Sequence, residues 1–260
     1  MRRGSLRAAL AIFGLLVLMI LASRCRAAEV PTAERLSARV RGSFPHDPTS
    51  YTQGLLWHSG ALFESTGQYG RSSLRRVDLA SGTVLDQRAL PDALFAEGLA
   101  RVEDRLVQLT WRAGLATAYD LESLEPLAEW NYQGEGWGLC FDGGQLWMSD
   151  GSDRLQRRDP ATFVALGELA VTLDGQPLQR LNELECAEGW IYANVYETNL
   201  IARIDPASGR VAALVDASNL LSAAEKEGAE VLNGIAYDAE REVFFLTGKY
   251  WPRLFEVTFE

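Results

Sequence analysis

The sequence contains few of the residues on which several classes of function depend. Among its 260 residues the 35 Asp and Glu outnumber the 25 Lys and Arg, so the formal net charge is −10. A surface that binds nucleic acid needs clustered basic side chains, and we therefore exclude nucleic acid as a partner. The scarce residues are Lys226, Lys249, His46, His58, Cys25, Cys140 and Cys186.

Several catalytic arrangements are also missing. Two histidines are too few for a catalytic metal centre built from histidine, and there is neither a closely spaced cysteine pair nor an HExxH motif. No nucleophile with a histidine partner is apparent, and no glycine-rich phosphate loop precedes a helix. These absences argue against covalent catalysis and against zinc-dependent hydrolysis.

Residues 1–28 are predicted to be a signal peptide, or a membrane anchor where they are not cleaved. Arg2, Arg3 and Arg7 precede an unbroken apolar run over 8–22, and cleavage near Ala27 or Ala28 would follow. The 232 residues that remain carry 20 basic and 35 acidic side chains, a net charge of −15. We therefore expect an exported protein, periplasmic or secreted, that meets a membrane only through an uncleaved N-terminus.

Export leaves Cys140 and Cys186 in a compartment where disulfides persist. The repeat alignment below sets these residues one step out of register, and a one-residue offset on a strand turns a side chain to the other face of the sheet. Two buried free thiols are therefore favoured here over a disulfide.

Five segments of the sequence resemble one another. They are QGLLWHSGALFESTG from Gln53, EGLARVEDRLVQLTW from Glu97, WGLCFDGGQLWMSDG from Trp137, NELECAEGWIYANVY from Asn182 and NGIAYDAEREVFFLTG from Asn233. Their starting positions are separated by 44, 40, 45 and 51 residues. Each contains a second apolar run, and a third run ends at an aspartate in turn-forming sequence at Asp78, Asp120, Asp159 and Asp205.

Four strands in about 45 residues are typical of a β-propeller blade. The fold class predicted is thus all-β, a five-bladed β-propeller forming a single domain over residues 29–260. A β-sandwich of the same strands would not require so regular a period. The fifth repeat has only three strands, and residues 35–44 are expected to add the fourth and close the ring. One helix is predicted, over 218–230.

The first strand of each blade lines the central channel of a propeller, so equivalent repeat positions form a ring of side chains. Here the residues of that ring are varied and mostly polar, whereas the residue that follows each of them in the sequence is glycine in four of the five repeats. A carboxylate, amides and an indole at the mouth of a channel suit a polar small molecule, although such groups can also merely satisfy one another. The ring consists of Gln53, Glu97, Trp137, Asn182 and Asn233.

The chain resembles the plant-type glutaminyl-peptide cyclotransferases, or glutaminyl cyclases, which also occur in bacteria. The resemblance rests on PHDPTSYTQGL (45–55), FESTGQYGRSSLR (63–75), EGWGL (135–139), NELE (182–185), IYANV (191–195), RIDPASG (203–209), LNGIAYD (232–238) and LTGKYWPRLFEV (246–257). It implies a five-bladed propeller and an enzyme of the aminoacyltransferase class. That enzyme would convert the N-terminal glutamine of a peptide into pyroglutamate and release ammonia. The substrate supplies its own nucleophile, in agreement with the absences above.

The resemblance also implies roles for individual residues. Glu97 would move protons as general acid and base, while Gln53, Asn182 and Lys249 would hold the amide and stabilise the oxyanion. The aromatic wall would consist of Tyr51, Phe95, Trp111, Trp137 and Tyr196. Tyr51 stands where Phe is common and Tyr196 where Trp is common, which leaves open the preference beyond the first residue. No metal or other cofactor is implied for catalysis, and a structural cation in the central channel is left open.

Two other readings of the fold compete with this enzyme. One is a non-catalytic periplasmic propeller that binds or scaffolds other proteins, since fold alone does not decide function. The other is a lactonase-like hydrolase, which would need carboxylates and amides around a catalytic calcium. Glu97 together with Gln53, Asn182 and Lys249 argues against the scaffold, and Trp137 in the ring argues against the hydrolase. We expect a monomer whose partners are peptides or proteins with N-terminal glutamine.

Overall fold

The computed structural model describes residues 31–260, and these form an all-β fold. The predicted segment 1–28 lies outside the described residues. No helix in the described part of the chain is long and apolar enough to cross a bilayer. The all-β prediction is confirmed.

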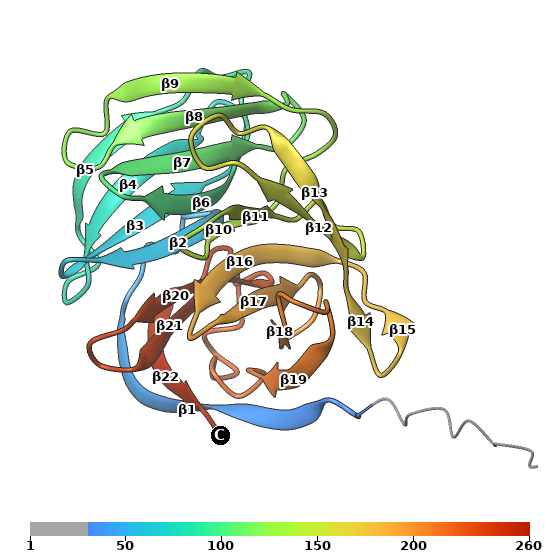
Figure 1. Ribbon diagram of the computed structural model, residues 1–260. Coiled ribbons are helices and arrows are strands. Elements are labelled where there is room, and N and C mark those ends of the chain that lie inside the picture. The colour runs from blue at the N-terminus through green and yellow to red at the C-terminus, as the bar shows by residue number, and fades with distance from the viewer. Residues whose placement is uncertain (1–30) are drawn as a thin grey trace, which may run out of the picture. The chain divides into compact units, whose positions relative to one another are not determined.

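Three sheets each contain four consecutive antiparallel strands (Figure 1). The first consists of β2 (Thr52–His58), β3 (Ala61–Thr66), β4 (Ser73–Asp78) and β5 (Val84–Ala89). The second consists of β6 (Ala96–Val102), β7 (Arg105–Thr110), β8 (Leu115–Asp120) and β9 (Pro126–Asn131). The third consists of β10 (Leu139–Phe141), β11 (Leu146–Met148), β12 (Arg154–Arg158) and β13 (Ala165–Ala170).

The remaining large sheet has eight strands in the order β16-β17-β18-β19-β1-β22-β21-β20. One half contains β16 (Leu181–Ala187), β17 (Trp190–Val195), β18 (Leu200–Ile204) and β19 (Val211–Asp216). The other half contains β20 (Leu232–Asp238), β21 (Val243–Gly248) and β22 (Arg253–Phe259). A short hairpin of β14 (Thr172–Leu173) and β15 (Gln176–Pro177) forms a separate two-stranded sheet, and a bridge between Thr172 and Arg210 links it to the start of β19.

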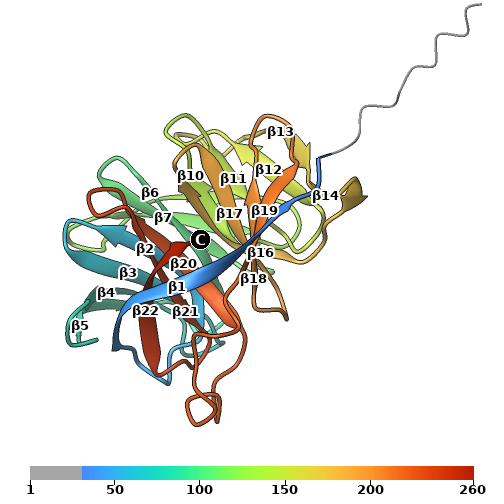
Figure 2. The same cartoon turned by 90° about the horizontal axis from the view of Figure 1, so that it is seen from below.

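Strand β1 (Glu34–Pro45) joins the two halves of the eight-stranded sheet. Its first part, from Glu34 to Ser37, pairs in parallel with β19, and its second part, from Ala38 to Pro45, pairs antiparallel with β22. Figure 2 shows β1 crossing from one to the other. The expected strand pairing with the last repeat is confirmed for residues 38–44, whereas residues 35–37 pair with β19 instead.

The first strands of the repeats pack against one another in a closed circle. Strand β2 contacts β6, β6 contacts β10, β10 contacts β16, β16 contacts β20, and β20 contacts β2 again (Figure 1). Glycine is needed where these strands meet, because a Cβ atom on Gly98 would lie 2.5 Å from the Leu139 amide nitrogen and one on Gly138 would lie 2.0 Å from the Asn182 carbonyl oxygen. The repeated glycine therefore marks close approach of neighbouring sheets.

The hydrophobic core is divided among the interfaces between neighbouring sheets. Leu74 of β4 and Leu106 of β7, for example, belong to one cluster of buried side chains, and Ile201 of β18 and Phe244 of β21 belong to another. Five such clusters occur among the described residues, one at each interface between consecutive sheets or half-sheets. Each sheet thus packs against a neighbour on both of its faces, and this packing fixes the positions of the strand ends.

The aspartates of the repeats form turns as predicted. A side-chain oxygen of Asp78, Asp120 and Asp159 accepts a hydrogen bond from the amide three residues later, at 2.8 Å in each case. Asp205 accepts one at 2.9 Å from Ala207, two residues later. A carboxylate that caps its own turn stabilises the tight connection to the fourth strand.

The helix predicted over 218–230 is wrong. This segment forms turns, in which the Lys226 amide donates to the Ser222 carbonyl at 3.1 Å, and Gly228 follows with a φ of +87°. One turn gains too few hydrogen bonds to offset the cost of nucleating a helix. Leu220 and Leu221 are nevertheless buried, because they pack against the adjoining sheets.

The prediction of free thiols is also wrong, because Cys140 and Cys186 form a disulfide with their Cα atoms 5.4 Å apart. Cys140 lies on β10 and Cys186 on β16, which belong to different sheets. The alternation of side chains holds along a strand and its hydrogen-bonded partners, whereas the stagger between two packed sheets is set by tertiary contacts. The disulfide therefore links two neighbouring sheets near their first strands.

Candidate active site

The nine candidate residues line one pocket. It has a volume of about 250 Å³ and opens at the ends where the first strands begin. Tertiary packing brings these residues together from five sheets or half-sheets and from the loops that precede or follow their strands. They are Tyr51, Gln53, Phe95, Glu97, Trp111, Trp137, Asn182, Tyr196 and Lys249.

A backbone irregularity presents the polar side chains to the pocket. The pairing of the first and second strands shifts register between Thr52 and Gly54, between Ala96 and Leu99, and between Leu181 and Leu184. A β-bulge leaves a residue outside the regular ladder and redirects its side chain. Gln53, Glu97 and Asn182 lie in these bulges, which explains why equivalent repeat positions converge on one site.

Glu97 lies at the end of a chain of hydrogen bonds between side chains. The Gln53 side-chain nitrogen donates to Glu97 Oε1 at 2.9 Å, and the Asn233 side-chain nitrogen donates to the Gln53 side-chain oxygen at 3.1 Å. Asn233 also donates to the Thr52 carbonyl at 3.0 Å. This arrangement fixes the orientation of both amides and leaves the second oxygen of Glu97 without a protein donor among the described residues.

The carboxyl group of Glu97 is almost fully buried, with 4% of the residue exposed. Burial raises the pKa of Glu97 well above its usual range, the charge of Lys249 lowers it, and the charge of Glu135 raises it further. A raised pKa lies closer to neutral pH, and a carboxyl group that titrates near the working pH can both accept and donate a proton. Such a shift in a pocket is also typical of a functional site.

Lys249 supplies the cation of the pocket. Its Nζ lies 4.5 Å from the centre of the Tyr51 ring and 5.0 Å from that of Tyr196, so both tyrosines offer it a π face. Burial lowers the pKa of Lys249, and the charges of Glu97 and Glu230 partly oppose this. The ammonium group is therefore stabilised by cation–π contacts with the two tyrosine rings and by the negative charges of Glu97 and Glu230.

Asn182 keeps an unused acceptor in the pocket. The residue is 2% exposed, and its side-chain oxygen has no hydrogen-bond partner among the described residues. A buried polar atom without a partner costs free energy. A ligand that donates to this oxygen would remove that cost.

The aromatic side chains contact one another around the pocket. Phe95 lies 5.5 Å from Trp111 and 6.0 Å from Tyr51, and Trp137 lies 5.6 Å from Tyr196, measured between ring centres. All three pairs are edge to face, which is a favoured geometry. The polar groups are thus enclosed by walls that exclude water and strengthen their interactions.

A buried ion pair, not expected from the sequence, supports the segment that carries Lys249. His46 donates from Nε2 to Glu64 at 3.0 Å and from Nδ1 to the Trp251 carbonyl at 2.7 Å. Both ring nitrogens face acceptors, an arrangement that favours the doubly protonated imidazolium form of His46. Burial lowers the pKa of His46, but the charge and hydrogen bond of Glu64 outweigh it and leave the pKa raised. Glu64 also accepts from Ser50 and Thr52, tying the start of β2 to residues 249–251.

Two further residues were missed as parts of the site. Asn233 was placed in the ring without a role, and its contact with Gln53 depends on the packing of β20 against β2. Glu135 accepts hydrogen bonds from the indole nitrogens of both Trp111 and Trp137. Its only sequence signal is its place in the string EGWGL, two residues before Trp137.

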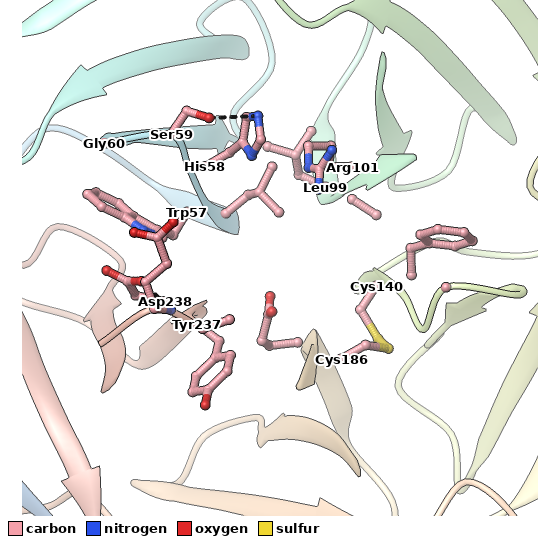
Figure 3. A pocket seen from close by; sticks show the side chains of 17 residues that line it. Trp57, His58, Ser59, Gly60, Leu99, Arg101, Cys140, Cys186, Tyr237 and Asp238 are labelled. Carbon is pink, nitrogen blue, oxygen red and sulfur yellow. Dashed lines mark hydrogen bonds between the residues drawn. A yellow bond between two sulfur atoms is a disulfide. The ribbon is translucent and has the colours of Figure 1, made fainter. Parts of the chain in front are cut away.

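A larger hollow of about 640 Å³ lies at the other ends of the first strands (Figure 3). Its wall includes His58, Arg101, Asp238 and the disulfide between Cys140 and Cys186. None of the nine candidate residues contributes to it. The smaller pocket is therefore the candidate active site, because all nine candidate residues line it and bring a buried carboxylate, side-chain amides, a lysine and aromatic walls together.

Comparison with known proteins identifies the family of this chain. The sequence profile of the glutamine cyclotransferase family matches residues 14–259, and the chain belongs to that family. It is similar to the glutaminyl-peptide cyclotransferase of Arabidopsis thaliana, with 40% identity over 223 residues, 84% of this chain and 70% of that protein. It is also similar to the crystal structure of Myxococcus xanthus glutaminyl cyclase, with 40% identity, a TM-score of 0.80 and coverage of 88% of this chain and 98% of that chain.

Proposed function

We propose that this protein is a glutaminyl-peptide cyclotransferase, which converts the N-terminal glutamine of peptides into pyroglutamate and releases ammonia. Membership of the glutamine cyclotransferase family and the two similar enzymes support this activity. The structural observation that carries it is the buried carboxyl group of Glu97, held by Gln53 inside an aromatic pocket.

The scaffold proposed is a five-bladed β-propeller in one domain over residues 29–260. Three four-stranded sheets and the two halves of the eight-stranded sheet would be its blades, with β1 as the strand that closes the ring. The circle of contacts among the first strands supports this arrangement, as do the five hydrophobic clusters between consecutive sheets.

In the proposed reaction the neutral α-amine of the substrate attacks the carbonyl carbon of its own side-chain amide. The new C–N bond closes a five-membered ring, and the old C–N bond breaks to release ammonia. The attacking nitrogen loses one proton and the departing nitrogen gains one, so a single group can carry the proton between them. Glu97 fits this role, because burial raises its pKa toward neutrality and because one of its oxygens faces no protein donor among the described residues.

The other polar residues are assigned to binding and to stabilisation of charge. Attack on the amide carbon places negative charge on its oxygen, and donors aimed at that oxygen commonly contribute several kcal/mol. Lys249 is the proposed principal donor, since its Nζ lies in the pocket and no carboxylate of the described residues contacts it directly. The Asn182 side chain is proposed to bind the substrate amide, and Gln53 to hold both the amide and Glu97.

The pocket suits one residue of the substrate. Its volume of about 250 Å³ lies below the roughly 300–1,000 Å³ that is typical of sites for larger ligands. The aromatic rings would pack on the aliphatic part of the glutamine side chain, and the rest of the peptide would extend to the outside. Proton transfer and oxyanion stabilisation are both provided by side chains, so we propose that catalysis requires no metal.

Export, to the periplasm or to the outside of the cell, is also proposed, on the basis of the basic and apolar N-terminal sequence. The protein is proposed to act as a monomer. Fractionation of cells followed by N-terminal sequencing of the protein checks both the compartment and the cleavage near residue 28.

The activity is tested with purified protein and a dipeptide that begins with glutamine. We expect ammonia and the pyroglutamyl product in equal amounts. An N-acetylated form of the same peptide is the matched control, since acetylation removes the nucleophilic amine and should abolish the release. Ammonia from the acetylated peptide would indicate an amidase instead, and no ammonia from either peptide would favour the non-catalytic binding or scaffold alternative.

A further inference from the structure

Glu135 lies between two walls of the pocket. It belongs to the loop that joins β9 to β10, and its side chain is 35% exposed. The backbone directly after Glu135 is held at two points, because the Gly136 amide donates to the Trp111 carbonyl at 3.0 Å and the Trp137 amide donates to the Ser149 carbonyl at 2.9 Å. The loop thus connects the second sheet with the third at the rim of the pocket.

The carboxylate of Glu135 contacts both indoles of the pocket wall. Its Oε2 accepts the Nε1–H of Trp111 at 2.7 Å and that of Trp137 at 3.0 Å. Its Oε1 accepts from Arg112 Nε at 2.9 Å, and the Arg112 guanidinium lies 3.8 Å from the centre of the Trp111 ring. One carboxylate therefore connects two aromatic side chains that come from different sheets.

These contacts set the orientation of the indoles. An indole has a single polar atom, its nitrogen, and a partly buried nitrogen needs an acceptor. Since both nitrogens point to Glu135, the apolar parts of both rings are left to form the wall. Burial raises the pKa of Glu135, but hydrogen bonds from Trp137, Arg112 and Trp111 outweigh it and lower the pKa below its ordinary value. The group is therefore ionised at neutral pH and forms strong hydrogen bonds.

We propose that Glu135 is a positioning residue that fixes Trp111 and Trp137 in the geometry needed to bind the glutamine side chain. It does not line the pocket itself and acts through the two indoles. This inference rests on the proposed function. It predicts an effect mainly on substrate binding, because the side-chain contacts of Glu135 are with the two indoles and Arg112. The charge of Glu135 also raises the pKa of Glu97, but Glu135→Ala and Glu135→Gln both remove that charge, so a difference between these two variants reports on the indoles.

The test compares Glu135→Ala with Glu135→Gln in steady-state cyclisation of a glutaminyl dipeptide. Loss of both charge-assisted hydrogen bonds in Glu135→Ala should raise KM about tenfold, whereas kcat should change by less than about threefold. The amide oxygen of Glu135→Gln can still accept from both indoles, so KM should return to within about twofold or threefold of the parental value. Glu129→Ala, an exposed residue of β9, is the matched control and should leave KM unchanged.

An unchanged KM in Glu135→Ala would overturn the proposal, as would a Glu135→Gln variant that is as impaired as Glu135→Ala. If Glu135→Ala does not fold, Glu135→Asp decides, because its shorter side chain cannot reach both indole nitrogens: a raised KM supports the role and a parental KM contradicts it. The parental protein separates this inference from the function, since failure of the parental protein to release ammonia rejects the activity itself.

Discussion

Replacement of Glu97 by glutamine is the most direct test of the proposed chemistry. The change is nearly isosteric, and the oxygen of the introduced amide can still accept from the Gln53 side chain, which donates to the carboxyl group of Glu97 at 2.9 Å. An amide cannot take up and release a proton at neutral pH, so only the acid–base role is lost. General acid–base catalysis is typically worth about 10²–10⁴-fold in rate, or about 2.7–5.5 kcal/mol of activation free energy. We expect kcat to fall by about that factor.

The stability of the same variant separates catalysis from folding. Because burial raises the pKa of Glu97, the folded state binds the proton more tightly than the unfolded chain. This contribution to stability is present below the unfolded pKa and is lost as the pH rises through the folded pKa. Glu97→Gln has no such loss, so its melting temperature should equal or exceed the parental value at neutral and alkaline pH, as measured by thermal unfolding with circular dichroism.

Ammonia release from a glutaminyl dipeptide at saturating substrate is the assay for kcat. Glu103→Gln is the matched control, since Glu103 is an exposed turn residue on the same hairpin as Glu97. The control should retain parental kcat and KM. Near-parental turnover by Glu97→Gln would refute the acid–base role, and a strong loss of kcat accompanied by unfolding would show that the loss has a structural origin.

Three further outcomes are expected. Removal of residues before Pro48 deletes β1 and should lower the melting temperature and broaden the transition, because β19 and β22 both lose a paired strand; a truncated protein that melts like the parent would contradict this. Replacement of both Cys140 and Cys186 by Ser should lower the free energy of unfolding by about 4 kcal/mol for a loop of 46 residues, measured by denaturant titration, and an unchanged midpoint would show that the bridge does not constrain the unfolded chain. Prolonged treatment with a strong chelator should leave kcat/KM within about twofold of the untreated enzyme, and a loss of activity restored by added metal in a still-folded protein would reject the metal-independent mechanism.

Local sequence patterns determined the strands and their turns. Alternating apolar residues define a strand wherever they occur, and an aspartate that caps its own turn needs only the next two or three residues, as Asp78 and Asp120 show. The recurrence of these patterns also located the ring that contains Gln53, Glu97 and Asn182, because repeats of one structural unit place equivalent residues at equivalent points. The missing fourth strand of the last repeat indicated where β1 pairs.

Contacts between different sheets were decided only by the tertiary structure. The disulfide between Cys140 and Cys186 depends on how two packed sheets are staggered. The spacing of residues along the sequence does not determine that stagger. Residues 218–230 have a helical pattern, but the packing of Leu220 and Leu221 and the turn at Gly228 outweigh their local preference.

The candidate active site also depends on contacts between different sheets. The sequence determined which residue types stand at the mouth of the pocket, whereas burial of Glu97, its hydrogen bond with Gln53 and the convergence of two indoles on Glu135 appear only when separate sheets meet. Hydrogen bonds and pKa shifts depend on distances of a few ångströms between groups far apart in the sequence. Residue identity is local information, and the chemistry that these residues perform depends on how the sheets pack.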